Sequence, residues 1–340
     1  MKISIVIPVY NVAPYLRAGL DSVVKQWREG VEVVAVNDGS KDDSLEVLRD
    51  YERRYPFLKV IDQPNAGVSV ARNAGIEATS GEWVTFMDPD DAYVDGAIAY
   101  LLDAVKKTTT DIVYYDSQVV YDQSEVVPLI KGSVRTVDLN DRGQVLDAVK
   151  TLCPIAWNCC YRRSALGSIR YVPGLAKSQD VVYGFTCFCK ARAIEVHATK
   201  LYKYYQRIDS CVHTVSEKRI RGDIDSSVYI FEEARKWKWY EDCKRVIFRK
   251  VRINAIGEAV ELIRKIETAK RGELWNYFFD RLTPVFASKG FVPTWQRPFY
   301  LLAFKHHSPL LVCWLLHRPY ALSKKLLRNS FLLDVWRKIR

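Results

Sequence analysis

Short apolar runs alternate with amphipathic stretches along the first third of the chain. Five runs, at 3–9, 31–37, 58–62, 83–88 and 111–115, are rich in β-branched and aromatic residues and predict buried strands. After the first run, Pro14 can open a helix on which Leu16, Leu20 and Val23 share one face. Strands that alternate with helices are typical of an α/β fold with a mostly parallel sheet.

The remainder of the chain changes character near residue 216. Residues 116–215 show a mixed pattern, with strand candidates at 117–121 and 201–206. Residues 219–280 contain no proline, and apolar positions such as Val228, Phe231, Val260 and Ile263 recur at helical spacing. We therefore expect two or three amphipathic helices in a helical extension over 216–290.

The predicted strands end in loops that lead into helix starts. Ser40 is a candidate N-cap for the helix whose apolar stripe begins at Leu45 and Leu48. Ligands of open α/β sheets bind beyond the carboxyl ends of the strands. The loops at 8–11, 37–40 and 88–91 are therefore expected to share one crevice.

Asp38 follows the second strand, within the sequence Asn-Asp-Gly-Ser at 37–40. A carboxylate at this place can accept a hydrogen bond from the N–H of a ligand base. The same four residues are also ordinary turn formers, so a purely structural turn is the alternative.

Three carboxylates, Asp88, Asp90 and Asp91, crowd the end of the fourth strand. Like charges at such spacing repel, and an oxygen-preferring cation such as Mg²⁺ or Mn²⁺ would neutralise them. That ion could also bridge a nucleotide diphosphate and stabilise the charge of the leaving group. The alternative is a solvated acidic turn capping a helix that starts near Val94.

A segment between these two motifs, residues 65–76, combines a turn-forming glycine with an arginine. Gly67 lets the backbone turn tightly, and Arg72 supplies a forked cation near the expected diphosphate. A helix with an exposed arginine is the structural alternative.

These elements, in this order, resemble family 2 glycosyltransferases of the GT-A fold. The resemblance rests on the opening segment 4–11, the Asn-Asp-Gly-Ser turn, the Ala-Arg-Asn-Ala-Gly helix at 71–75 and the Asp-x-Asp-Asp loop. It implies that Asp38 binds the uracil of a UDP-sugar, Asp88 faces the ribose and Asp90 binds the metal, Mn²⁺ or Mg²⁺. The implied donor site also includes Arg72 and the loop residues Pro8, Val9, Tyr10 and Asn11.

The similarity continues through 156–158 and 161–164 to Gln179-Asp180. The family usually has Glu-Asp there, and its aspartate is the catalytic base, which implies that role for Asp180. Gln179 departs from the pattern and removes one neighbouring charge. Residues 204–210 resemble the strand that closes the site, which implies a place near the diphosphate for Arg207. His213 is a further candidate for a metal or diphosphate contact, and a structural histidine is the alternative.

The resemblance covers residues 1–215 and divides them into a nucleotide-sugar half, 1–115, and an acceptor half, 116–215. It implies an inverting transferase that moves a sugar from a UDP-sugar to a hydroxyl of a glycan acceptor, with a lipid-linked glycan of a surface polysaccharide as our expectation. Two rivals are a sugar nucleotidyltransferase and a membrane-docked sensor that binds sugar nucleotides without transferring them. A sugar nucleotidyltransferase usually has a Gly-rich loop with a basic residue after its first strand, and this chain has no such loop at 8–11. No P-loop or dinucleotide fingerprint occurs either.

Charge is concentrated at the end of the chain. Of the net charge of +11, residues 291–340 contribute +8, from nine basic side chains and Asp334. The aromatic residues of this segment suit the depth of a membrane interface: Trp295, Phe299, Tyr300, Phe304, Trp314 and Tyr320. Its apolar runs fall short of the ~20 residues of a membrane span. We expect a basic amphipathic segment on an anionic membrane surface, against the alternative of helices that pack on the protein.

The remaining features bear on partners and compartment. No recognised nucleic-acid motif accompanies the basic charge, so we expect no nucleic-acid partner. The eight cysteines form no CxxC pair, which disfavours a zinc site. No secretory pattern is visible near residues 3–9, so the expected location is cytoplasmic, peripheral on the inner face of the plasma membrane.

Overall fold

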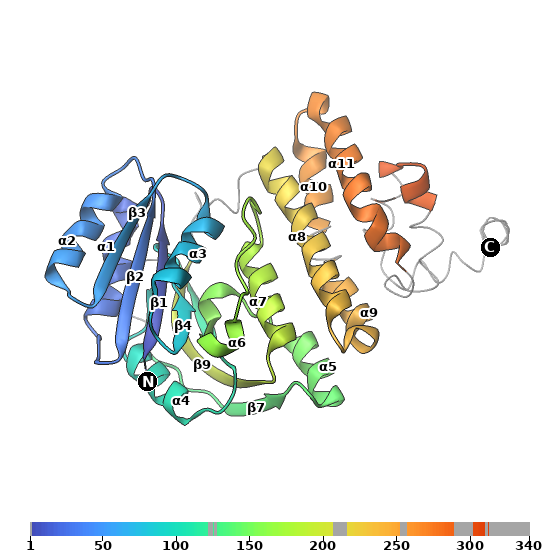
Figure 1. Cartoon of the computed structure of the whole chain (residues 1–340). Coiled ribbons are helices and arrows are strands. Elements are labelled where there is room, and N and C mark those ends of the chain that lie inside the picture. The colour runs from blue at the N-terminus through green and yellow to red at the C-terminus, as the bar shows by residue number, and fades with distance from the viewer. Residues whose placement is uncertain are drawn as a thin grey trace. The chain divides into compact units, whose positions relative to one another are not determined.

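The computed structural model describes residues 2–121, 125, 128–206, 216–251, 257–288, 302–309 and 312 (Figure 1). The chain forms two compact units, one of residues 1–175 with 179–214 and the other of 176–178 with 215–340. The first is an α/β unit and the second is helical. The further division of the second into an extension and a basic interface segment stays a prediction.

The described part of the α/β unit contains one nine-stranded sheet, in which eight strands follow the order β3-β2-β1-β4-β8-β6-β9-β5 and β7 pairs with β9. Its strands are β1 Ile3–Val9, β2 Val31–Asp38, β3 Leu58–Gln63, β4 Trp83–Phe86, β5 Ala92–Tyr93, β6 Ile112–Val120, β7 Val134–Asp138, β8 Cys159–Arg162 and β9 Ala193–Tyr205. Its α-helices are α1 Ala13–Val24, α2 Ser44–Arg54, α3 Val68–Ala78, α4 Ala97–Lys107, α5 Arg142–Thr151, α6 Arg163–Leu166 and α7 Gln179–Lys190.

Strands β3, β2, β1 and β4 are parallel neighbours, as their apolar sequences predict. Figure 1 shows α1 and α2 on one side of these strands and α3 on the other. Alternate residues of each strand point to opposite faces of the sheet. Ile5 and Val33 belong to the large core with Leu16 of α1, whereas Val34 and Val36 pack against Ala71 of α3. Burial on both faces explains why β1, β2 and β4 have nearly continuous apolar sequences.

The second half of the sheet is mixed and differs from the expected elements. β8 is antiparallel to β4 and to β6, whereas β9 runs parallel to β6. The strand predicted at 117–121 is the second half of β6, and the one predicted at 201–206 is the end of β9. A shift of register near Asp116 separates the two parts of this strand pair. β6 is continuous there, whereas Ala198, Thr199 and Leu201 are extra residues on β9.

Two predicted helix starts are wrong. Ser40 is not an N-cap: α2 begins at Ser44 after Asp43, and the Ser40 hydroxyl accepts a hydrogen bond from the backbone N–H of Asn11 instead. The helix expected near Val94 begins at Ala97, after Gly96 in a left-handed conformation. Ala92 and Tyr93 form β5 against β9 before that helix can start. In both places a contact distant in sequence overrides the local signal.

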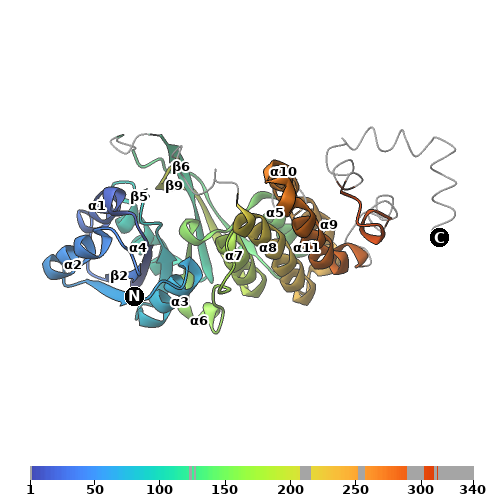
Figure 2. The same ribbon diagram turned by 90° about the horizontal axis from the view of Figure 1, so that it is seen from above.

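The helical unit contains α8 Glu217–Lys236, α9 Tyr240–Val251, α10 Gly257–Lys265 and α11 Thr268–Ala287. Within the described residues of 216–288 these are four helices, where two or three were predicted over 219–280. Helix α8 packs against each of the other three (Figure 2). None of the described helices is both long and apolar enough to cross a bilayer.

Phe304 corrects one prediction for the basic segment. Its ring is 3% exposed and lies 4.6 Å from the ring of Phe286 and 5.3 Å from that of Phe279. This aromatic side chain therefore belongs to the core of the helical unit, not to a membrane interface. Trp295, Phe299, Tyr300, Trp314 and Tyr320 lie outside the described residues.

Candidate active site

The three predicted loops follow strands that are parallel and adjacent in the order β2-β1-β4. Asp38 ends β2, Tyr10 and Asn11 follow β1, and Asp88 lies two residues beyond β4. Parallel strands present their carboxyl ends at one edge of the sheet. The fold therefore brings the expected loops together at that edge, as open α/β sheets do for their ligands.

The loop after β1 is tied to the loop after β2. Asn11, with a φ of 51°, donates its backbone N–H to the hydroxyl of Ser40 and accepts the N–H of Lys41 on its side-chain oxygen. Pro8 and Val9 are buried inside β1, so they position the loop from within the core. Tyr10, at 45% exposure, is the first side chain of the loop that is open to solvent.

Asp38 is 2% exposed, and its carboxylate organises the loop before α3. Oδ1 accepts the backbone N–H of Ala66 at 2.9 Å and the side-chain amide of Gln63 at 2.8 Å, while Oδ2 accepts the N–H of Gly67 at 2.8 Å. A carboxylate has about four acceptor directions. Three of these directions are used, and no donor of a described residue occupies the fourth, on Oδ2. A hydrogen bond from the uracil N–H to this oxygen stays a prediction.

Arg72 links the start of α3 to the acidic loop. Its Nη2 donates to Oδ1 of Asp88 at 2.7 Å, and its guanidinium lies 5.2 Å from the ring centre of Tyr171. The side chain is buried, which corrects the alternative of an exposed arginine. Nε and Nη1 have no hydrogen-bond partner among the described residues. A buried guanidinium with two free donors is suited to an incoming anion.

The neighbours of Arg72 explain the rest of the Ala-Arg-Asn-Ala-Gly sequence. Asn73 exchanges two hydrogen bonds with the backbone of Tyr171, one from its amide and one to its carbonyl oxygen. Gly75 faces β1, where an added Cβ would lie 2.3 Å from a methyl carbon of Val6. These contacts hold α3 close to the sheet and fix the direction in which Arg72 extends.

The three carboxylates after β4 have different surroundings. Asp88 is half-buried and paired with Arg72, and its backbone N–H donates to the hydroxyl of Tyr202 at 2.9 Å. Asp91 points inward, is buried, and accepts the backbone N–H of Tyr205. Burial, with the charges of Asp88 and Asp90 added, raises the pKa of Asp91 well above its usual value. Arg72 thus balances the charge of Asp88, whereas the raised pKa of Asp91 reflects its burial and the charges of the two neighbouring carboxylates.

The acidic loop packs directly on α1 and on an aromatic stack. A Cβ at Gly19 would lie within 2.9 Å of the carbonyl oxygens of Pro89 and Asp91. Trp157 stacks on Tyr202 with ring centres 4.8 Å apart, and on Tyr204 at 5.7 Å. Sequence reasoning missed Tyr202, although it lies two residues before Tyr204 and therefore on the same face of β9.

Asp180 stands in the first turn of α7. Its pKa is raised, chiefly by burial and also by the charge of Asp88, while Arg72 opposes the rise. Contacts place α7 beside Arg72, because Tyr183 of α7 stacks on Tyr171, over which the Arg72 guanidinium lies. A carboxylate with a raised pKa is a better proton acceptor near neutral pH than an ordinary aspartate. The side-chain oxygen of Gln179 is buried with no hydrogen-bond partner among the described residues.

The structure does not test the remaining site predictions. Arg207 and His213 lie outside the described residues. Within the described ranges, no three His, Cys, Asp or Glu side chains converge to hold a metal by themselves. Mg²⁺ in nucleotide sites is usually held by one or two carboxylates with phosphate oxygens and water. Asp90, the predicted metal ligand, supplies a hard oxygen donor of that kind, and its metal contact stays a prediction.

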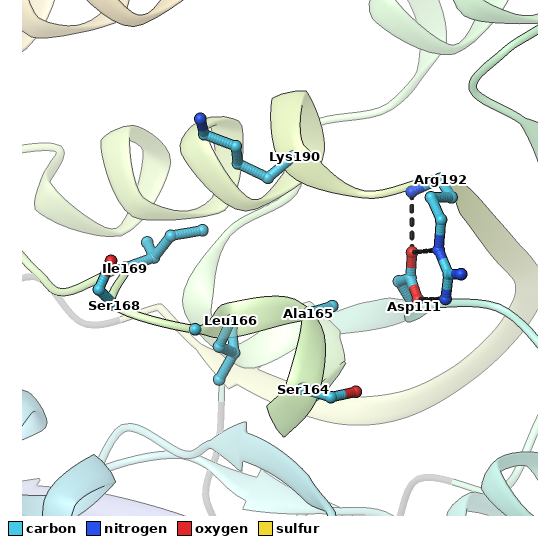
Figure 3. Close-up of a pocket in the computed structure, with 9 residues that line it drawn as sticks. Asp111, Ser164, Ala165, Leu166, Ser168, Ile169, Lys190 and Arg192 are labelled. Carbon is cyan, nitrogen blue, oxygen red and sulfur yellow. Dashed lines mark hydrogen bonds and ion pairs between the residues drawn. The ribbon is translucent and has the colours of Figure 1, made fainter.

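A pocket of about 560 Å³ lies elsewhere in the α/β unit (Figure 3). It is lined by Ser164, Ser168, Lys190 and the ion pair of Asp111 with Arg192. Asp111 precedes β6, and Ser164 follows β8 at the end where Arg162 pairs with Trp83, the first residue of β4. The pocket therefore belongs to the opposite edge of the sheet and is separate from the acidic cluster.

The fold, with Arg72 and Asp88 paired at the carboxyl ends of its parallel strands and α7 beside them, is that of a GT-A domain. Residues 4–170 match the family model described as Glycosyl transferase family 2, and the domain belongs to that family.

Two relatives illustrate the similarity. The chain is 28% identical over 229 residues to YibD of Escherichia coli, described as an uncharacterized glycosyltransferase, with 64% of each chain covered. It is 31% identical over 252 residues to the poly(ribitol-phosphate) beta-glucosyltransferase of Bacillus spizizenii, covering 70% of this chain and 39% of the relative. The matched region thus spans less than two thirds of either relative.

The fold resembles that of residues 1–349 of TarS from S. aureus. That structure in complex with UDP-GlcNAc has a TM-score of 0.73, with 20% sequence identity and coverage of 97% of this chain and 93% of that chain. The same fragment in complex with UDP has a TM-score of 0.72.

Proposed function

We propose that this protein is an inverting glycosyltransferase that moves a sugar from a UDP-sugar to a hydroxyl of a glycan acceptor. One observation carries the proposal: buried Arg72 pairs with Asp88 and lies over the ring of Tyr171, which stacks on Tyr183 of α7, the helix that also carries Asp180. Arg72 therefore connects the proposed donor site with the helix of the proposed base, at the carboxyl ends of the strands. Two unpaired donors on the same guanidinium offer contacts to the diphosphate.

In the proposed reaction, Asp180 accepts the proton of the acceptor hydroxyl as that oxygen attacks the anomeric carbon. The new bond forms on the face opposite UDP, the bond from the anomeric carbon to the diphosphate oxygen breaks, and UDP leaves with the electron pair. The single displacement inverts the configuration, so an α-linked donor gives a β-glycoside. Arg72 stabilises negative charge on the departing group. A bound Mn²⁺ or Mg²⁺ supplies further positive charge there.

The relatives motivate the substrates that we propose. The Bacillus relative is named as a poly(ribitol-phosphate) glucosyltransferase, and the TarS fragment was solved with UDP and UDP-GlcNAc. We therefore propose a UDP-sugar donor and, as acceptor, a lipid-linked glycan or polymer of a bacterial surface polysaccharide. The basic segment 291–340 would place the enzyme on an anionic membrane, and binding to phosphatidylglycerol but not phosphatidylcholine vesicles is the expected result.

A panel of nucleotide sugars tests the proposed activity directly. UDP, GDP and TDP sugars are incubated with the protein, Mn²⁺ and a lipid-linked glycan acceptor, and the released nucleotide and the product are measured. We expect transfer from a UDP-sugar with inverted configuration. Formation of a nucleotide sugar from a sugar phosphate would favour a nucleotidyltransferase, and binding without turnover would favour a sensor. Retention of configuration would contradict the single displacement.

Metal dependence is a separate prediction, centred on Asp90. EDTA should abolish transfer, and added Mn²⁺ should restore it. Asp90→Asn removes one anionic oxygen donor, so the Mn²⁺ concentration for half-maximal activity should rise by about tenfold or more. Asp103→Asn, on the exposed face of α4, is the matched control and should leave that concentration unchanged. Full activity of the wild type in EDTA would contradict the prediction.

A further inference from the structure

Residues 176–178 belong to the helical unit, although the sequence places them between two parts of the α/β unit. The chain leaves the α/β unit after Leu175 and re-enters it at Gln179, where α7 begins. Asp180, the proposed base, is the second residue of that helix. The three residues immediately before α7 are therefore held by the helical unit.

The backbone of segment 176–178 lies directly against α8 at Gly222. A Cβ on Gly222 would lie 2.7 Å from the backbone nitrogen of Lys177 and 3.2 Å from the carbonyl carbon of Ala176. Glycine inside a helix costs about 1 kcal/mol relative to alanine. The close approach of the two backbones accounts for a glycine in the middle of this long helix.

A partly buried charge cluster surrounds Lys177 and includes side chains of α8 and α10. Its Nζ lies 3.7 Å from Oε1 of Glu258 at the start of α10, and Arg219 of α8 donates to the same carboxylate. Asp223 is 1% exposed, and neither of its carboxylate oxygens has a hydrogen-bond partner among the described residues. Burial raises the pKa of Asp223 to about 7, and Glu258 adds to the rise while Lys177 and Arg219 oppose it. Lys177 thus interacts with acids of both helices, Asp223 of α8 and Glu258 of α10.

Ser178 shows that the segment is held in a costly conformation. Its φ of 56° lies in the left-handed region, which residues other than glycine rarely adopt. Such a conformation costs about 1–3 kcal/mol and persists only where surrounding contacts impose it. Ser178 is followed directly by α7, so the direction in which this helix starts depends on how the segment is held.

We propose that the helical unit sets the position of Asp180 through segment 176–178, with Gly222 and Glu258 as positioning residues. The inference rests on the proposed function, in which Asp180 is the base. Only three peptide bonds separate Lys177 from Asp180, so a displaced Lys177 displaces the carboxylate as well. An error of about 1 Å in the placement of a reacting group can cost about 100-fold in rate. The helical extension is then part of the catalytic apparatus.

Two glycine variants give a matched test. Gly222→Ala introduces the Cβ that meets Lys177, whereas Gly272→Ala adds one to α11 where nothing lies within 4 Å. We expect Gly222→Ala to lower kcat by about tenfold or more, with KM for the UDP-sugar and the Kd of UDP unchanged within about twofold. Gly272→Ala should leave all three constants unchanged.

A charge variant covers the case in which Gly222→Ala fails to fold. Glu258→Gln keeps the volume and removes the charge that pairs with Lys177, and Glu261→Gln, on the same helix, removes a charge that pairs with Arg264. We expect kcat to fall by about threefold to tenfold in the first and to stay unchanged in the second. The acid limb of the pH profile should move in Glu258→Gln, because the surroundings of the base change.

The outcomes separate this inference from the proposed function. If the wild type transfers sugar and Asp180→Asn does not, full kcat in folded Gly222→Ala and Glu258→Gln overturns the inference alone. A fall of kcat that is matched by a fall in UDP affinity and Tm also overturns it, because that pattern is general destabilisation. If the wild type transfers no sugar, the proposed function fails and the inference fails with it.

Discussion

Replacing Asp180 with asparagine is expected to lower kcat for sugar transfer by about 10²–10⁴-fold, the usual contribution of a general base. The amide has nearly the same shape but cannot accept the acceptor's proton. The Kd of UDP should change by less than about threefold, because the proposed UDP contacts come from other side chains. Transfer is measured with the best donor of the nucleotide-sugar panel, and UDP binding by calorimetry.

The pH profile provides a second readout for Asp180. The base works only when deprotonated, so activity falls as the pH drops through its pKa. Burial and Asp88 raise that pKa, so the acid limb of kcat/KM should lie at higher pH than the 3.8 of an ordinary aspartate. Asp147→Asn, at an exposed position of α5, serves as the control and should keep both rate and profile. Full activity of Asp180→Asn would remove this residue from the mechanism.

Arg72→Met is expected to impair stability and activity together. The change leaves Asp88 without its partner, and breaking a buried ion pair costs about 3–5 kcal/mol. Asp88 has a 28% exposed side chain and can regain some water, so we expect the lower end of this range. Two anion donors are lost as well, and UDP affinity should fall by about tenfold or more. Chemical denaturation and UDP titration measure the two effects.

The loss of Arg72 should also move the acid limb upward. Its positive charge lowers the pKa of Asp180, so without it the carboxylate takes up a proton at a higher pH and activity at neutral pH falls. Arg162→Met is the matched control. That guanidinium also lies over an aromatic ring, 4.4 Å from the centre of Trp83, but at the opposite edge of the sheet. The Arg162→Met variant should be less stable than the wild type, but the acid limb of its pH profile should not move. An identical shift of the acid limb in both variants would contradict the assignment of Arg72 as the cation that lowers the pKa of Asp180.

Local patterns were sufficient for the parallel half of the sheet. β1 has the predicted bounds, and β2 and β3 each end one residue later than predicted. β1 and β2 are buried on both faces, so their apolar runs carry a clear signal. β3 alternates buried Leu58 and Val60 with exposed Lys59, the pattern of a strand with one buried face. The prediction that Ser40 is an N-cap was wrong, because a serine that caps a helix and a serine that accepts a hydrogen bond from a distant residue cannot be told apart in sequence. β6 was predicted as two separate strands, and only the end of β9 was predicted, beyond the extra residues that interrupt its pairing with β6.

The amino-acid sequence by itself determined the family, the order of the strands that carry the loops, and the acidic residues that end them. The tertiary structure decided what each carboxylate does. Asp88 and Asp91 are three residues apart, yet one pairs with Arg72 and the other is buried against the backbone of Tyr205. The role of a carboxylate depends on its burial and on the charges beside it, and those come from α3, α7 and β9, which lie far away in sequence.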